Sequence, residues 1–123
     1  MINGATADGW PLPDRTAIDE ILQTLRAAQV TASVCHNDIP ALAIADRARQ
    51  LGWAIPGDLS IVAYEDRVST RATTPLTTVV LPGYEVGRVA AQALLEQLEG
   101  PDRRPRQIRI QPDLVVREST GRP

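Results

Sequence analysis

Apolar residues recur at intervals of three and four in three parts of the chain, which is the spacing of helices with one buried face. The three stripes are Ile18, Ile21, Leu22, Leu25 and Ala28; then Ala41, Leu42, Ile44, Ala45, Ala48 and Leu51; and then Val86, Val89, Ala90, Ala93, Leu94 and Leu98. Gly52 and Gly100 follow the second and third stripes, where glycine commonly ends a helix. The pattern predicts helices over residues 16–28, 41–51 and 84–98.

Short apolar runs lie between these stripes and favour buried strands. The runs are Val30–Cys35, Leu59–Tyr64 and Thr77–Leu81. Two further short strands are predicted near the C-terminus, at Gln107–Ile110 and Leu114–Val116. Strands that are apolar throughout and alternate with helices are typical of a parallel sheet covered by helices. The sequence therefore predicts an α/β fold, a three-layer sandwich with a largely parallel sheet.

The composition narrows the class of protein. A chain of 123 residues is one modest domain, and without Phe its core must be mainly aliphatic. A net charge of -2 gives no global case for binding nucleic acid. Cys35 is the only cysteine, so no intramolecular disulfide can form, which fits a reducing cytosol. With no membrane-length apolar run and no signal-like start at Met1, we expect a cytoplasmic protein and no membrane partner.

Polar clusters follow two of the predicted strands. They are His36-Asn37-Asp38 and Glu65-Asp66-Arg67. Parallel strands would bring both clusters to the carboxyl edge of the sheet, where ligands of open α/β sheets bind. An amide together with a carboxylate suits a polyhydroxylated ligand such as a sugar. The alternative is that Asp38 only caps a helix and that the residues after Tyr64 are solvated loop charges.

Trp10 lies in a loop rich in glycine and proline, outside any helical stripe. Its ring could stack on a ligand, or it could cover the edge of a domain. An enzyme is disfavoured, because His36 is the only histidine and no Ser/His/Asp set, phosphate loop or zinc spacing is present. Neighbouring residues of an extended segment point to opposite sides, so Cys35 and His36 form a poor nucleophile–base pair. We therefore expect no catalytic residue, no metal and no cofactor.

Taken in order, several blocks resemble the LacI/GalR family of transcription regulators. They are Cys35-His36-Asn37-Asp38 with the helix to Gly52, Ile55-Pro56-Gly57-Asp58-Leu59-Ser60-Ile61-Val62, Ala63-Tyr64-Glu65-Asp66, Pro75-Leu76-Thr77-Thr78-Val79, Glu85-Val86-Gly87 with its helix, and Leu114-Val115-Val116-Arg117-Glu118-Ser119-Thr120. With a looser match at Trp10, they cover residues 10–120.

The resemblance implies the effector-sensing part of such a regulator. Family members have a two-lobed sensor of the type I periplasmic-binding-protein fold, and they bind an effector, often a sugar or nucleobase, between the lobes. Residues 1–123 would be a partial effector-binding domain, mostly its C-terminal lobe. The helix within 82–100 would belong to the missing N-terminal lobe, with crossings near Leu81 and near the C-terminus. DNA would be contacted only through a helix-turn-helix that this chain lacks.

The resemblance also implies particular site residues and a symmetric partner. Asn37 matches an asparagine that faces the effector, Glu65 matches an aspartate that takes ligand hydroxyls, and Trp10 falls near a stacking aromatic. Glu65 is longer than that aspartate by one methylene, and Ala43, Ala63 and Gly83 also depart from the family pattern, so the ligand class stays open. The family's dimer contacts map to Ala41–Leu51 and 69–74, which predicts a homodimer. The alternative is part of a periplasmic sugar-binding protein of a transporter.

Overall fold

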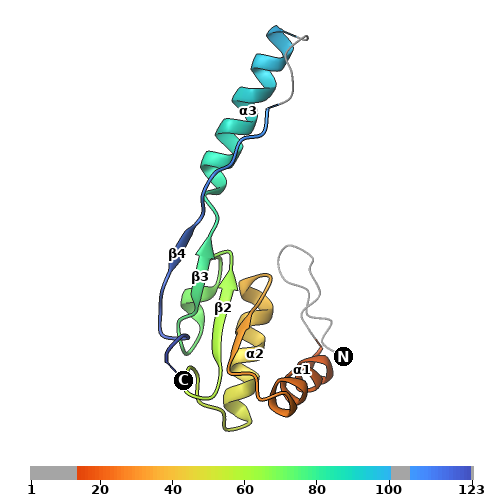
Figure 1. Cartoon of the computed structure of the whole chain (residues 1–123), viewed down its shortest axis with the longest axis vertical. Coiled ribbons are helices and arrows are strands. Elements are labelled where there is room, and N and C mark those ends of the chain that lie inside the picture. Colours follow the sequence, from red (N-terminus) through yellow and green to blue (C-terminus); the bar gives the residue numbers. More distant parts are fainter. Residues whose placement is uncertain (1–13, 101–105, 123) are drawn as a thin grey trace.

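The structure is a computed structural model that describes residues 14–100 and 106–122, and it contains one four-stranded sheet (Figure 1). The strand order follows the chain: β1 (Ala32–Val34), β2 (Ser60–Tyr64), β3 (Thr77–Val80) and β4 (Asp113–Val115). The first three strands are parallel, and β4 is antiparallel to β3. The predicted α/β fold with a largely parallel sheet is thus confirmed. The strand predicted over 107–110 is wrong, because those residues join no ladder.

Three helices occur where the apolar stripes predict them, α1 (Arg15–Ala27), α2 (Asp38–Gln50) and α3 (Gly83–Glu99), with a short 3-10 helix, η1 (Ser69–Arg71), after β2. Asp14 caps α1 by accepting a hydrogen bond from the Thr16 N–H. The interpretation of Asp38 as the cap of α2 is wrong. Asn37 has the extended backbone of a cap, and its Oδ1 accepts from the Ile39 N–H at 3.0 Å.

The core lies between the sheet and helices α1 and α2. Its buried members come from both helices, from β2 and the residue before it, and from the segments next to β1, η1 and β3: Ile18, Leu22, Cys35, Ala41, Ile44, Ala45, Ala48, Leu59, Ile61, Ala63, Ala72 and Leu76. Side chains alternate along β2, so Ile61 and Ala63 are buried while Ser60, Val62 and Tyr64 are more exposed. Within the described residues no helix packs on that second side, where Val34 is 75% exposed. The third layer of the predicted sandwich is therefore not formed by these residues.

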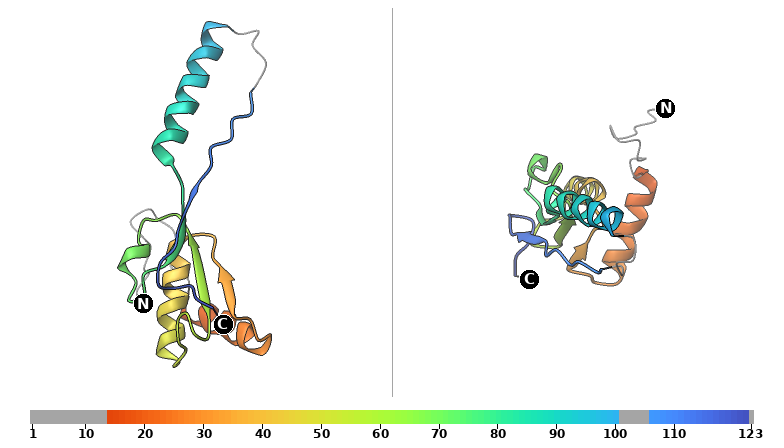
Figure 2. Two further views of the ribbon diagram at one scale, coloured as in Figure 1. Left: turned by 60° about the vertical axis from the view of Figure 1, so that its left-hand side comes forward. Right: turned by 90° about the horizontal axis from the view of Figure 1, so that it is seen from above.

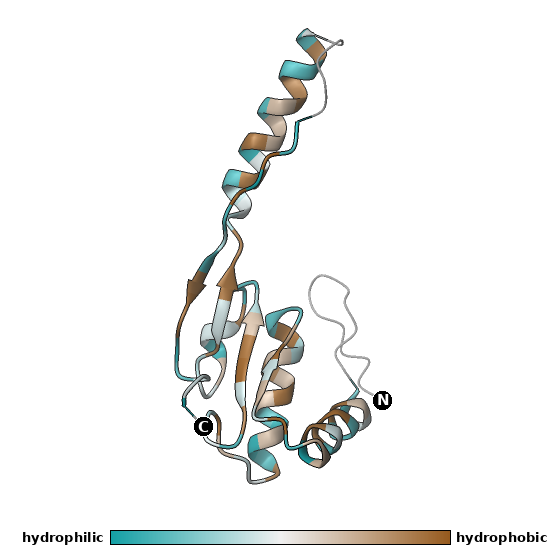
Figure 3. Ribbon diagram, viewed as in Figure 1, coloured by the Kyte–Doolittle hydropathy of each residue, from teal (hydrophilic) through white to brown (hydrophobic). Residues whose placement is uncertain are grey.

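Helix α3 projects away from this body, and residues 106–112, which lead into β4, run beside it (Figures 1 and 2). It leaves the sheet just after β3, and none of its residues is buried. Its apolar residues alternate with polar ones along its length (Figure 3), and Tyr84, Leu94, Leu95 and Leu98 are exposed. We call α3 and residues 106–112 the arm. Its two connections to the rest of the structure are the paired strands β3 and β4. That α3 belongs to a second lobe stays a prediction.

Candidate ligand-binding site

Asn37 and Glu65 lie at the same edge of the sheet. Parallel neighbours β1 and β2 end at Val34 and Tyr64, and the two polar residues follow within three positions of those ends. Helix α3 leaves β3 at this edge as well, so the arm rises beside it (Figures 1 and 2). Both residues are half-buried. The structure therefore brings the two described candidates to one edge, and Trp10 lies outside the described residues.

The cap of α2 fixes the orientation of Asn37. The Cys35 N–H donates to the Val62 carbonyl at 2.8 Å, which extends the β1–β2 pairing beyond the strand ends. Asn37 then turns the chain into α2, and its side-chain oxygen is engaged by the Ile39 N–H. A ligand at this edge would meet the amide –NH2 group of Asn37, which is a donor of two hydrogen bonds.

Glu65 stands on a backbone that its neighbours hold in an unusual conformation. Its φ of 69° is in the left-handed region, which costs a residue with a Cβ about 1–2 kcal/mol. Its N–H donates to the Val79 carbonyl at 2.9 Å, and its own carbonyl accepts from the Thr78 hydroxyl. Because residues of β3 hydrogen-bond both the N–H and the carbonyl of Glu65, the backbone that carries the carboxylate is fixed at the edge of the sheet.

Asp66 is exposed, as one interpretation of the sequence expects of a loop charge, but it also forms an ion pair. Its carboxylate oxygens lie 2.8 and 2.7 Å from the two terminal nitrogens of Arg117, and Arg117 also donates to the Leu76 carbonyl at 2.8 Å. The hydrogen bond from the guanidinium holds the pKa of Asp66 below its usual range, with the Arg117 charge adding to it and partial burial opposing it. Sequence patterns missed this pair because its members are 51 positions apart.

We expect Asp66→Asn to lower the free energy of unfolding at pH 7 by up to about 1 kcal/mol, because the pair is partly exposed. A carboxyl whose pKa is depressed by folding stabilises the fold above its unfolded pKa and loses that contribution as pH falls through its folded pKa. The difference in the free energy of unfolding between wild type and Asp66→Asn should therefore become smaller as pH falls from 5 to the folded pKa of Asp66 and below it. Urea unfolding across this pH range measures it, and a constant difference would contradict the assignment.

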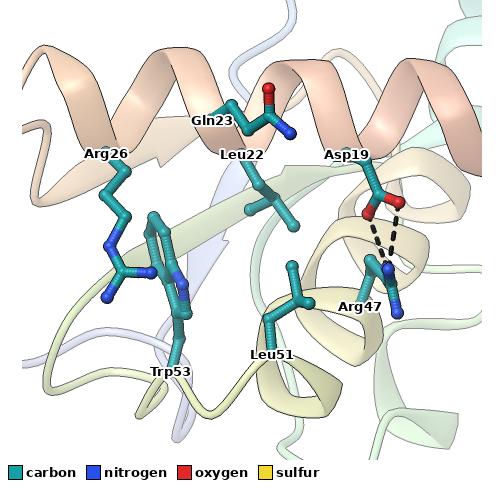
Figure 4. A pocket seen from close by; sticks show the side chains of 7 residues that line it. All are labelled: Asp19, Leu22, Gln23, Arg26, Arg47, Leu51 and Trp53. Atoms are coloured by element: carbon teal, nitrogen blue, oxygen red, sulfur yellow. Dashed lines mark hydrogen bonds and ion pairs between the residues drawn. The ribbon is translucent and has the colours of Figure 1, made fainter.

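A separate pocket of about 160 Å³ lies between α1 and the C-terminal end of α2 (Figure 4). Asp19 and Arg47 form an ion pair on one side of it, with Nε 2.5 Å from Oδ1. On the other side, the Arg26 guanidinium lies 5.5 Å from the centre of the Trp53 ring. The charged side chains of this pocket thus each interact with a neighbouring side chain of the pocket. The pocket lies at the opposite end of α2 from Asn37. We interpret this pocket as a gap in the packing between α1 and α2 and not as a ligand site.

The described part of the chain gives little support for a metal site, a reactive cysteine or a membrane-spanning helix. No cluster of three or more His, Cys, Asp or Glu side chains there is arranged to hold a metal ion. Cys35 is buried, and burial raises the pKa of its thiol, which disfavours the reactive thiolate. None of the described helices combines the length and the apolar character that crossing a membrane requires.

Comparison with known proteins gives one consistent result. The sequence matches the family described as "Periplasmic binding protein-like domain" over residues 4–120. It is 36% identical over 104 residues to the "HTH-type transcriptional repressor PurR" of Aliivibrio fischeri (strain MJ11), covering 84% of this chain and 31% of the repressor. The chain therefore spans about a third of the length of this curated relative.

Solved structures agree with the sequence match. The complex of the transcriptional regulator CelR with cellobiose superposes with a TM-score of 0.74 and 32% identity, over 85% of this chain and 32% of CelR. The lac repressor dimer bound to operator and the anti-inducer ONPF gives a TM-score of 0.72 and 28% identity, over 84% of this chain and 36% of the repressor. The chain belongs to the family of periplasmic-binding-protein-like domains, and its homologues are transcription regulators of the LacI type.

Proposed function

We propose that this chain is the effector-sensing part of a LacI/GalR-type transcription regulator, and that it binds a small polar ligand such as a sugar. The observation that carries the proposal is that Asn37 and Glu65 follow the carboxyl ends of adjacent parallel strands, at one edge of the sheet. An amide that donates and a carboxylate that accepts can together bind neighbouring hydroxyl groups. The cellobiose bound to the similar regulator CelR supports this choice of ligand class.

The arm supports a site between two lobes. Helix α3 begins at the edge that carries Asn37 and Glu65. Its apolar side chains are exposed here, and we expect another part of the complete sensor to pack against them. We assign α3 to the N-terminal lobe of the complete sensor, with β3 and β4 as the crossings between lobes. A ligand at the edge of the sheet would then be enclosed from both sides, and Trp10 would pack on its face.

The same proposal assigns partners to the complete regulator. It would work in the cytoplasm without catalytic activity, and it would contact DNA through a helix-turn-helix outside these residues. It would also form a homodimer through α2 and the segment that begins with η1, which contact each other in this structure. The dimeric state of the similar lac repressor supports this arrangement. Relatives that are repressors favour a regulator over a transporter's binding protein.

Substitutions at the two edge residues test the site in the complete regulator. Asn37→Ser keeps a good helix cap but removes the amide donors, and Glu65→Gln removes the charge at nearly constant size. We expect each to weaken the binding of the effector by about tenfold to a hundredfold, which corresponds to the roughly 1–3 kcal/mol of a buried polar group that loses its partner. Calorimetric titration measures the dissociation constants, with cellobiose as the first ligand tried.

A matched control separates a lost contact from a general effect on folding. Gln23→Ala changes an exposed polar residue of α1, which lines the pocket at the far end of α2. It should bind the effector as wild type does. If Asn37→Ser and Glu65→Gln also bind as tightly as wild type, the assignment of the site is wrong even though the family stands.

A further inference from the structure

Asp38 is a buried carboxylate with an unusual set of contacts. It is 0% exposed, and it begins α2 directly after Asn37. Its Oδ2 accepts from the Val68 N–H at 2.5 Å, while its Oδ1 has no hydrogen-bond partner among the described residues. A buried polar atom without a partner costs free energy, so such groups in folded proteins call for an explanation.

Helix capping does not explain this residue. Asn37 already supplies the cap of α2 through its own side chain. A negative charge in the first turn is favourable beside the positive end of a helix, by about 0.3–1 kcal/mol at exposed positions. An exposed carboxylate at a neighbouring position of that turn could provide this without burial, so the contact with Val68 distinguishes Asp38.

The contact with Val68 ties α2 to the loop that carries Glu65. Val68 lies three positions after Glu65, and the adjacent Ser69 is fully buried. The Ser69 hydroxyl lies 3.4 Å from Asp38 Oδ2 and 3.5 Å from the Glu65 carbonyl oxygen, so it can donate to either one. The loop from Glu65 to Ser69 is therefore anchored to β3 at its start and to Asp38 at its end.

We propose that Asp38 is a positioning residue of the ligand site, which acts together with the hydrogen bonds from β3 to keep the loop of Glu65 in its conformation and in place relative to Asn37. The inference rests on the proposed function for the identity of the site. Asp38 is bonded covalently to Asn37 and by a hydrogen bond to the loop of Glu65, so its buried side chain links the two groups directly.

The first test needs no ligand. Amide hydrogen exchange by NMR on the 123-residue chain compares wild type with Asp38→Ala and Asp38→Asn. Without an acceptor, the Val68 N–H should exchange about tenfold to a hundredfold faster in Asp38→Ala, the change that a lost buried hydrogen bond predicts. Asp38→Asn keeps a side-chain oxygen, and it should restore exchange to within about threefold of wild type. The backbone shifts and coupling of Glu65 should leave the left-handed range in the alanine variant alone.

A control and two outcomes keep this test decisive. Asp19→Ala removes a carboxylate that pairs with Arg47 at the other end of α2, and it should leave Val68 and Glu65 unchanged. Equal acceleration at Ile61 and Ala63 of β2 in Asp38→Ala would indicate general destabilisation and overturn the proposal. Unchanged exchange at Val68 and an unchanged backbone at Glu65 would overturn it too.

The second test measures ligand binding in the complete regulator, with cellobiose as the probe. Asp38→Ala should bind about tenfold or more weakly than wild type, while Asp38→Asn should stay within about threefold. Wild-type affinity in Asp38→Ala, with the loop shown to be loosened, would remove the positioning role. If wild type and Asp38→Ala both fail to bind cellobiose, that result counts against the sugar-binding function, and the exchange experiment alone decides the role of Asp38.

Discussion

Ile61→Ala should lower the free energy of unfolding by about 2–5 kcal/mol, the usual cost of replacing a large buried side chain with alanine. Ile61 is the second residue of β2, where it pairs with Ser33 of β1, and it is 0% exposed. It belongs to the one core cluster that α1, α2 and the sheet share. A total stability of about 5–15 kcal/mol is typical of small domains, so this loss alone could leave the chain marginally folded.

Denaturant unfolding measures this loss, and two further variants calibrate it. Ile61→Val removes one methylene and should cost about 0.5–1.5 kcal/mol. Val34→Ala changes a strand residue that is 75% exposed, and it should stay within about 0.5 kcal/mol of wild type. If Ile61→Ala and Val34→Ala cost the same, the face of β2 that packs against α2 has been assigned incorrectly.

The periodicity of apolar residues predicted most of the fold. All three helical stripes correspond to helices, because each helix needs one apolar face regardless of what covers it. The parallel strands were predictable for a similar reason, since short apolar runs that alternate with helices are typical of a parallel sheet. The same logic placed Asn37 and Glu65 at one edge before any geometry was known, and the structure brings them there.

Contacts between residues far apart in the sequence, and the extent of strand pairing, were not predictable. Asp38 meets Val68 across 30 positions and Asp66 meets Arg117 across 51, and no local pattern specifies which groups will meet. The segment at 107–110 resembles a strand, yet β3 ends at Val80 and the chain continues into α3, so that segment has no strand to pair with. A strand needs a partner, and the sequence of one segment does not report whether its partner is present.

Ser119→Ala should be the most costly change of a polar residue, since it leaves two buried backbone groups without partners. The Ser119 hydroxyl donates to the Ile61 carbonyl at 2.6 Å and accepts from the Thr77 N–H at 2.8 Å. Its own backbone N–H donates to Pro75, and its carbonyl accepts from the Ile61 N–H. Ser119 therefore lies between β2 and β3 where both begin, and it closes the gap between them as a strand residue would.

Each buried group left unpaired costs about 1–3 kcal/mol, so we expect Ser119→Ala to lower the free energy of unfolding by several kcal/mol. Thr120→Ala is a suitable control, because within residues 14–100 and 106–122 its hydroxyl bonds only the Thr77 hydroxyl, at 2.8 Å, and Thr120 is only partly buried. That variant should lose about 0.5–1.5 kcal/mol, the net value of one hydrogen bond. Hydrogen exchange should also locate the damage in Ser119→Ala at Thr77, with the α1 amides unaffected. A loss no larger than that of Thr120→Ala would mean that the strands close this gap without the serine hydroxyl.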